Sequence, residues 1–228
     1  MTEYQADGKT IRIYPAKQAA GAPVVLDNEY EENGSAILAR CRKMSCRPFH
    51  LVTVSGVDWD RELSPWPSAP VASEEDRFTG QGPEYLHWLT EHVLPSAQEI
   101  LQQEHPVCYI TGYSLAGLFA LWSLYETDIF HGAVSASGSM WYPEFEHFAS
   151  TEPLKGSPDG IYLSLGRKES QVRNRLLQEN ETISRRLSEY YVSRGIYFVF
   201  ELNPGNHYTE PDLRLAKGIS WLLQDTAQ

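Results

Sequence analysis

A serine lies in the segment of this chain with the clearest capacity for chemistry. Ser114 stands in Gly-Tyr-Ser-Leu-Ala-Gly (112–117), after the β-branched and apolar run 107–111 and before the apolar run 118–125. This order predicts a buried parallel strand, a sharp turn and a tightly packed helix. At such a turn, a nucleophile elbow, backbone strain lifts the serine Oγ above the sheet at the helix N-terminus. We therefore predict that Ser114 is a nucleophile.

The segment departs from the G-x-S-x-G pattern at one position. Ala116 replaces the second glycine, which normally lets the helix approach the neighbouring strand closely. Alanine adds a single methyl group, and Gly117 follows directly, so we expect the replacement to be tolerated. Alone, however, the motif fits an ordinary Gly-Ser turn between any strand and helix equally well. Residues elsewhere in the chain must decide.

A nucleophilic serine needs a general base, and the base needs an acid that orients it. In open α/β sheets the ligand binds beyond the carboxyl ends of the strands, so useful side chains directly follow strands. Glu169 follows the predicted strand 160–166, and His207 lies in a Pro-Gly-Asn turn after the predicted strand 196–202. The chain order serine, acid, histidine is that of α/β hydrolases. We predict His207 as the base and Glu169 as its acid.

Both assignments have alternatives. His147 is a weaker rival of His207 for the role of base. Glu169 could equally be an acid in the first turn of the following helix, favoured there by the helix dipole, which would leave a Ser/His dyad. Asp159 precedes its strand and belongs to the wrong end of the sheet, so it is discounted.

The tetrahedral intermediate of acyl transfer needs backbone donors in an oxyanion hole. By the topology of an elbow, the first is the N–H of Leu115. The second is expected in the loop after the predicted strand 23–27, at Asn28, Glu29 or Tyr30. Backbone donors leave no side-chain signature, so this prediction rests on topology alone.

Composition sets the broad class of the protein. The chain has 228 residues, of which 42% are hydrophobic and 21% charged, as in an ordinary soluble domain. We predict one domain over 1–228. The formal net charge of -11 argues against nucleic acid or an anionic membrane as a partner, because phosphate binding needs clustered Lys and Arg. A small neutral or cationic substrate remains open, and so does the oligomeric state, a homo-oligomer included.

Targeting and metal signals are weak. The amino-terminal residues do not resemble a signal peptide, and no apolar run approaches the roughly 20 residues that span a bilayer, so we expect a cytoplasmic protein. Three cysteines, Cys41, Cys46 and Cys108, do not form a disulfide framework or a zinc pattern. We expect neither a metal nor a cofactor.

Strand and helix patterns alternate along the chain. This predicts an α/β-hydrolase fold, with a mostly parallel central sheet and helices on both faces. The strand 10–14 alternates apolar and polar residues, which suggests the sheet edge. The irregular segment 58–80 is a candidate pocket wall, or else a surface loop anchored by Trp59 and Trp66. The remaining predicted strands are 23–27, 49–56, 107–111, 131–138, 160–166 and 196–202, and the helices are 33–41, 82–103, 118–125, 170–194 and 210–223.

Several motifs together resemble the putative-esterase family of α/β hydrolases, which includes esterase D, enterochelin-type siderophore esterases and feruloyl or acetyl-xylan esterases. The similarity covers most of the chain. The motifs are the helix 80–95 with its end at Glu91 to Pro95, the nucleophile helix 112–121, the S-x-S-x-W strand end at 135–142, the G-x-x-E…N arrangement of Glu169 and Asn174, and Pro204-Gly205-Asn206-His207, in which Asn206 replaces a glycine. The chain lacks the longer amino-terminal hairpin and insertions of many members, which predicts an open site.

The resemblance implies roles for residues of this chain. Ser114, Glu169 and His207 take the roles of nucleophile, acid and base. Arg61, with Pro65, resembles a family loop that borders the pocket. Trp141 would line the acyl or leaving-group pocket. We predict Arg61, Trp141 and Tyr113 as substrate-binding residues. The leading hypothesis is a serine hydrolase that cleaves a carboxylic ester. An acyltransferase on the same site and a non-catalytic α/β-hydrolase-like binding protein are the alternatives.

Overall fold

One eight-stranded sheet forms the centre of the molecule. The computed structural model describes residues 1–17, 20–71 and 73–224, and its strands follow the order β1-β2-β4-β3-β5-β6-β7-β8. β2 pairs antiparallel with β1 and β4, whereas every neighbouring pair from β4 to β8 is parallel. The strands are β1 (Thr2–Ala6), β2 (Lys9–Tyr14), β3 (Val24–Asn28), β4 (His50–Ser55), β5 (Cys108–Tyr113), β6 (Phe130–Ala136), β7 (Gly160–Gly166) and β8 (Phe198–Asn203).

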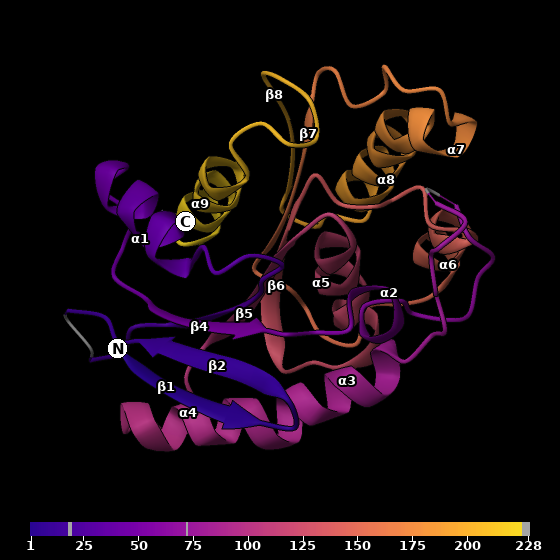
Figure 1. Ribbon diagram of the computed structural model, residues 1–228. Coiled ribbons are helices and arrows are strands. Elements are labelled where there is room, and N and C mark those ends of the chain that lie inside the picture. Colours follow the sequence, from indigo (N-terminus) through magenta and orange to yellow (C-terminus); the bar gives the residue numbers. More distant parts are fainter. Residues whose placement is uncertain (18–19, 72, 225–228) are drawn as a thin grey trace.

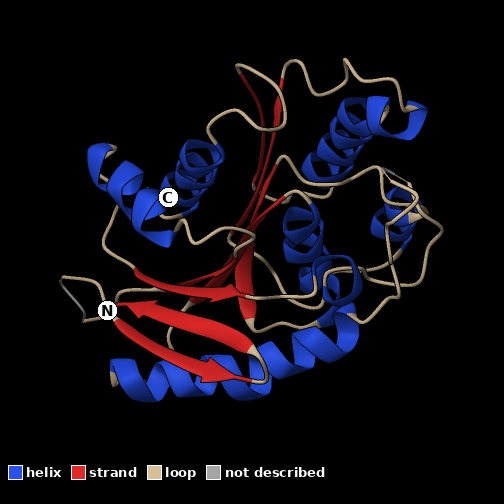
Figure 2. Cartoon of the chain, viewed as in Figure 1, coloured by secondary structure: helices blue, strands red, loops and turns tan. Residues whose placement is uncertain are grey.

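Helices cover both faces of this sheet, as Figures 1 and 2 show. α1 and α9 pack together on one face, and α5, α8 and the α3–η1–α4 segment cover the other. The predicted fold class, an α/β-hydrolase fold with a mostly parallel sheet, is confirmed. The helices are α1 (Gly34–Lys43), α2 (Trp59–Glu62), α3 (Gly82–Trp88), the π-helical turn η1 (Leu89–Val93), α4 (Leu94–Leu101), α5 (Leu115–Glu126), α6 (Phe145–Thr151), α7 (Arg175–Gln178), α8 (Asn180–Ser193) and α9 (Pro211–Leu222).

Burial explains the uninterrupted apolar runs of the sequence. Every residue of β3, β4 and β7 is buried, because helices cover both faces of these strands. α5 is buried at every position except Glu126, as its apolar residues on all sides predict. The strand before Ser114 and the helix after it therefore lie in a buried part of the molecule.

The amino-terminal hairpin differs from the prediction. The segment 10–14 was expected at the sheet edge, but β1 pairs with β2 and is itself the edge. The two strands are joined by Asp7 and Gly8, with φ of 48° and 78°. A two-residue turn with positive φ at both positions matches the right-handed twist of the flanking strands, and Asp-Gly is well suited to it. The edge prediction was wrong because this turn adds a further strand.

The other differences concern helices. The predicted helix 82–103 is interrupted by η1, where the N–H of Leu94 donates to the carbonyl of Leu89, five residues back. Pro95 follows directly; it has no N–H to give and would crowd a regular preceding turn, so the wider turn accommodates it. The predicted helix 170–194 is split into α7 and α8, and two helices, α2 and α6, were not predicted. Residue 72 of the predicted loop 58–80, together with residues 18–19 and 225–228 of the predicted domain, lies outside the described residues.

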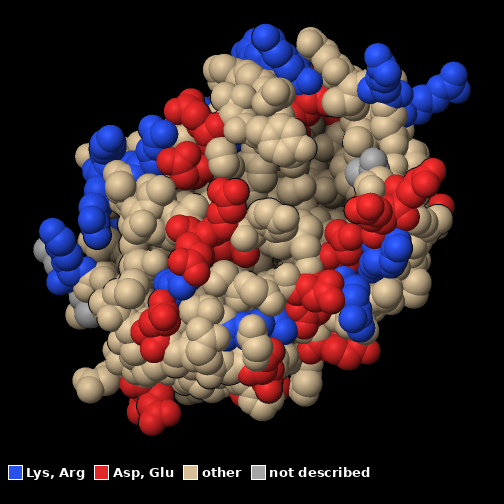
Figure 3. All heavy atoms as spheres, viewed as in Figure 1, with Lys and Arg blue, Asp and Glu red and all other residues tan. Residues whose placement is uncertain are grey.

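The surface reflects the acidic composition. On the face in Figure 3, acidic side chains flank a hollow near the centre. Within the described residues, none of the helices combines the length and apolar character that crossing a membrane would require.

Candidate active site

Ser114 stands at a strained turn between β5 and α5. Its backbone has φ 58° and ψ -121°, a conformation that costs a non-glycine residue about 1–3 kcal/mol. The turn is held by its own backbone: the Ser114 N–H donates to Ala136 O, and its carbonyl accepts from the N–H groups of Gly117 and Ser139. The surroundings thus impose the strained geometry that a nucleophile elbow requires.

The glycines at this turn explain why Ala116 is tolerated. A Cβ on Gly112 would lie 2.3 Å from the carbonyl oxygen of Ala116 and 2.7 Å from its methyl group. A Cβ on Gly117 would lie 2.9 Å from Ser135 Oγ. The close approach of helix and strands therefore depends on Gly112 and Gly117, and the methyl of Ala116 occupies space that Gly112 leaves free.

Three side chains from separate loops meet beyond the carboxyl ends of the parallel strands. His207 Nε2 lies 3.1 Å from Ser114 Oγ, and His207 Nδ1 lies 2.9 Å from Glu169 Oε2. An imidazole protonated at Nδ1 donates to Glu169 and accepts the serine proton at Nε2. The structure thus brings the three predicted catalytic residues together, in the geometry of a Ser-His-acid triad.

Glu169 lies in a turn and not in a helix. Its N–H donates to Gly166 O, at the end of β7, and the next helix begins only at Arg175. The alternative that placed this acid in the first turn of a helix is therefore wrong. Burial tends to raise the pKa of the Glu169 carboxyl, but the hydrogen bonds from His207, the Gly166 N–H and Ser137 outweigh it, so the net pKa is lowered. The ionised form is the one that can orient an imidazole.

Two residues that sequence reasoning missed complete the surroundings of this acid. Ser137 Oγ lies 2.8 Å from Glu169 Oε1, and Arg214 Nη1 lies 2.7 Å from the same oxygen. Ser137 directly follows β6, so the rule that useful side chains follow strands could have identified it. Arg214 lies within α9, where no local pattern distinguishes it from a surface arginine.

Tyr113 is the last residue of β5. Its hydroxyl donates to the carbonyl of His207 at 2.6 Å and is within 3.1 Å of Arg214 Nη1. The hydroxyl is therefore engaged in holding the loop of the histidine, and the role of Tyr113 in substrate binding stays a prediction.

The predicted oxyanion donors divide into two groups. The N–H of Glu29 donates to Val54 O at 2.9 Å, and Asn28 is the last residue of β3, with its side-chain oxygen bonded to the Tyr85 hydroxyl. The N–H of Glu29 is therefore already engaged, and Asn28 belongs to the sheet. Leu115 opens α5 and Tyr30 follows the strand in an exposed loop, and among the described residues neither N–H has a hydrogen-bond partner. These two N–H groups stay the predicted donors of an oxyanion hole.

The two remaining substrate-binding predictions have different outcomes. Trp141 is half-buried two residues after Ser139, whose N–H binds the Ser114 carbonyl, and its ring centroid lies 6.3 Å from that of Phe78 in the segment 58–80. Trp141 is therefore close to the nucleophile in the chain and beside the predicted pocket wall. The Arg61 guanidinium is exposed and lies 3.4 Å from Asp58, the residue before its own helix α2. The structure describes no contact between Arg61 and the triad.

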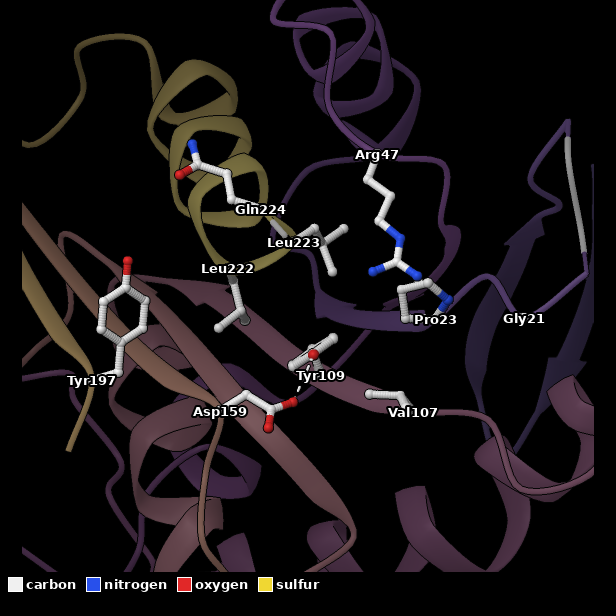
Figure 4. A pocket seen from close by; sticks show the side chains of 10 residues that line it. All are labelled: Gly21, Pro23, Arg47, Val107, Tyr109, Asp159, Tyr197, Leu222, Leu223 and Gln224. Atoms are coloured by element: carbon white, nitrogen blue, oxygen red, sulfur yellow. Dashed lines mark hydrogen bonds between the residues drawn. The ribbon is translucent and has the colours of Figure 1, made fainter. Parts of the chain in front are cut away.

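A cavity of about 450 Å³ lies at the opposite end of the sheet (Figure 4). It is lined by Pro23, Val107 and Asp159, which directly precede β3, β5 and β7. Asp159 accepts a hydrogen bond from the Tyr109 hydroxyl at 2.9 Å. The discounted acid thus lies at the amino ends of the strands, away from Ser114. Among the described residues, no group of three or more His, Cys, Asp and Glu side chains is arranged to hold a metal ion.

Sequence comparison finds a relative that matches part of this chain. The Bacillus subtilis (strain 168) protein described as "Uncharacterized protein YbbA" is 25% identical over 135 residues, which are 56% of this chain and 54% of that protein. The chain thus spans about half the length of the curated relative it matches.

Solved structures share the whole architecture at low identity. An IroE-like serine hydrolase from Shewanella oneidensis superposes with a TM-score of 0.79 at 15% identity, covering 97% of this chain and 79% of that one. The siderophore hydrolase EstA from Aspergillus nidulans gives a TM-score of 0.72 at 18% identity, covering 94% and 89% of the two chains. The model of the family described as "Putative esterase" matches residues 10–210. With this match over most of its length, the chain belongs to the "Putative esterase" family of α/β hydrolases.

Proposed function

We propose that the protein hydrolyses carboxylic esters through an acyl-enzyme on Ser114. The observation that carries this proposal is the hydrogen-bonded chain from Ser114 through His207 to Glu169, which begins at a strained elbow. A non-catalytic protein with this fold has no need of such strain, because strain destabilises the folded state and serves no structural purpose there.

In the first half of the reaction, Ser114 Oγ attacks the ester carbonyl carbon while its proton passes to His207 Nε2. The carbonyl oxygen becomes an oxyanion that accepts hydrogen bonds from the N–H groups of Leu115 and Tyr30, assisted by the positive end of α5. The resulting imidazolium is stabilised by ionised Glu169. When the intermediate collapses, the C–O bond to the alcohol breaks, and His207 gives its proton to the departing oxygen.

In the second half, a water molecule replaces the alcohol. His207 removes a proton from the water as its oxygen attacks the acyl carbon, and the same backbone donors hold the second oxyanion. The bond to Ser114 Oγ then breaks, Oγ regains a proton from His207, and the carboxylic acid leaves. The triad is regenerated without a cofactor.

The substrate is expected to be bulky and not anionic. Trp141 and Phe78 offer aromatic faces beside the turn of Ser114, which favour a large or aromatic group on one side of the ester. The net charge of -11 disfavours anionic substrates through long-range repulsion. A panel of esters that differ in size and charge but share one leaving group would test this.

Labelling with a fluorophosphonate probe tests the nucleophile itself. We expect the unchanged protein to be labelled and to hydrolyse a short-chain p-nitrophenyl ester, and Ser114→Ala to do neither. Ser150→Ala, which changes a serine on the surface of α6, is the matched control and should behave like the unchanged protein. An unlabelled native protein, or equal labelling of native protein and Ser114→Ala, would contradict the proposal.

A further inference from the structure

Arg214 is a large, basic side chain that is almost completely buried near the candidate site. It is the fourth residue of α9 and is 1% exposed. A buried charge is costly unless it is paired and hydrogen-bonded. Its partners therefore indicate why it is there.

One nitrogen of the guanidinium faces the acid of the triad. Nη1 lies 2.7 Å from Glu169 Oε1 and 2.6 Å from Ser137 Oγ, and Ser137 Oγ in turn lies 2.8 Å from the same carboxylate oxygen. The Gly166 N–H also donates to Oε1. Three donors thus hold Oε1, which fixes the direction in which Oε2 points: toward His207 Nδ1.

The other nitrogen faces the loop of the base. Nη2 lies 2.7 Å from the carbonyl oxygen of Asn206 and 3.1 Å from that of Pro204. These carbonyls flank Gly205, whose φ of 87° turns the chain sharply just before His207. The residue directly before the histidine is thus bonded to the same guanidinium as the acid.

We propose that Arg214 is a positioning residue that sets the geometry between Glu169 and His207. Its Nη1 binds the Glu169 carboxylate, and its Nη2 binds the loop before His207. This rests on the proposed function, because the geometry matters only if His207 acts as a base. Only a planar fork with several donors in fixed directions can hold both partners at once. Lysine would keep the charge but could hold only part of this arrangement.

Kinetics of three variants separate positioning from simple packing. We expect Arg214→Met to lower kcat for a p-nitrophenyl ester by about 100-fold with KM within about twofold, since a misplacement of about 1 Å has effects of this size. Arg214→Lys should recover about a tenth of the native kcat. The matched control is Arg40→Met, because Arg40 also anchors α9, through Asp212 at 2.8 Å, but has no described contact with the triad. It should keep kcat within about twofold.

A second readout does not depend on catalysis. The proton on His207 Nδ1, shared with Glu169, is expected to give a low-field NMR signal in the native protein and in Arg40→Met, and a shifted or lost signal in folded Arg214→Met. This signal tests the inference even if the native protein proves not to react with fluorophosphonate, a result that would contradict only the proposed function. Folded Arg214→Met with native kcat and an unshifted signal would overturn the inference. So would equal losses of kcat in Arg214→Met and Arg40→Met.

Discussion

The buried carboxyl groups of Glu169 and Asp27 have opposite hydrogen-bonding environments. On the side of the base, Glu169 accepts hydrogen bonds from Gly166, Ser137 and Arg214 at one oxygen and faces His207 with the other. On the side of the predicted oxyanion hole, Asp27 is 1% exposed in β3, and among the described residues neither of its carboxyl oxygens has a hydrogen-bond partner. The same type of group is thus fully paired on one side and unpaired on the other.

The electrostatic consequence is also opposite. Hydrogen bonds lower the net pKa of Glu169 against the effect of its burial, so it is held ionised. Burial, reinforced by the charge of Glu29, raises the pKa of Asp27 well above its usual value, which favours its neutral form. An anion is useful beside an imidazole that must gain a proton, and the ionised acid is the one that faces His207.

The largest expected effect comes from removing the anion on the base side. Glu169→Gln should lower kcat for ester hydrolysis by about 10³- to 10⁴-fold, because the amide cannot favour the required imidazole tautomer or stabilise the imidazolium. The measurement is steady-state hydrolysis of a short-chain p-nitrophenyl ester. Glu146→Gln, which removes a carboxylate paired with Arg186 on the surface, is the control. If Glu169→Gln kept activity within a few-fold of native, Glu169 would have no part in the mechanism.

The next effect tests whether the acid on the other side is neutral. The unfolded chain ionises Asp27 near pH 4, whereas the folded protein retains the proton to a higher pH. Between these values the unfolded state binds fewer protons, so the native protein loses stability as pH rises. Asp27→Asn lacks this loss, and its advantage should grow by up to about 1.4 kcal/mol per pH unit above pH 4.

Urea unfolding of native protein and Asp27→Asn at a series of pH values measures this difference. Below pH 4 the carboxyl is neutral in both the folded and the unfolded state. The difference in unfolding free energy between the two proteins should therefore no longer change with pH there. A difference in unfolding free energy that stays constant from pH 4 to 8 would show that Asp27 ionises normally, and the contrast with Glu169 would fail.

A smaller effect concerns the strained residue between the two sides. Ser114→Gly should exceed Ser114→Ala in free energy of unfolding by about 1 kcal/mol, because glycine accepts positive φ and relieves more strain than its added chain entropy costs. Both variants lack Oγ, so the comparison isolates the backbone. Equal stability of the two variants would mean that the turn at φ 58° carries no significant strain.

The smallest expected effect sharpens the description of the base side. Tyr113→Phe removes the hydroxyl that donates to the His207 carbonyl and should lower kcat by about three- to fivefold, in keeping with the loss of one hydrogen bond of about 1 kcal/mol. KM should stay near native, because the hydroxyl is engaged in holding the loop. A large rise in KM at unchanged kcat would instead support the predicted role in substrate binding.

Side chains that follow strands were the predictable part of this molecule. The alternation of strands and helices predicted the sheet, and the rule that ligands bind beyond the carboxyl ends of strands selected Ser114, Glu169 and His207 for one site. The structure brings His207 within hydrogen-bond reach of both Ser114 and Glu169. Seven strands were predicted, and each has a counterpart in the structure.

Features that depend on contacts between distant segments could not be predicted. Arg214 is defined by partners 8 to 101 residues away in the chain, and periodicity in a helix does not reveal which arginine will be buried. The hydrogen bond of the Tyr113 hydroxyl likewise depends on the distant loop 204–207. The missing strand β1 is different: Asp7-Gly8 is a recognised hairpin signal, and the prediction overlooked it.

The position of His207 in the chain also has a consequence for the candidate site. His207 and Arg214 both follow β8, the last strand along the chain, and Arg214 lies on a helix that packs across β6 and β7. Until these carboxyl-terminal segments dock, Ser114 has no hydrogen bond to His207, and Glu169 is not held by Arg214. Under the proposed function, reactivity at Ser114 therefore requires the carboxyl-terminal part of the fold to be in place.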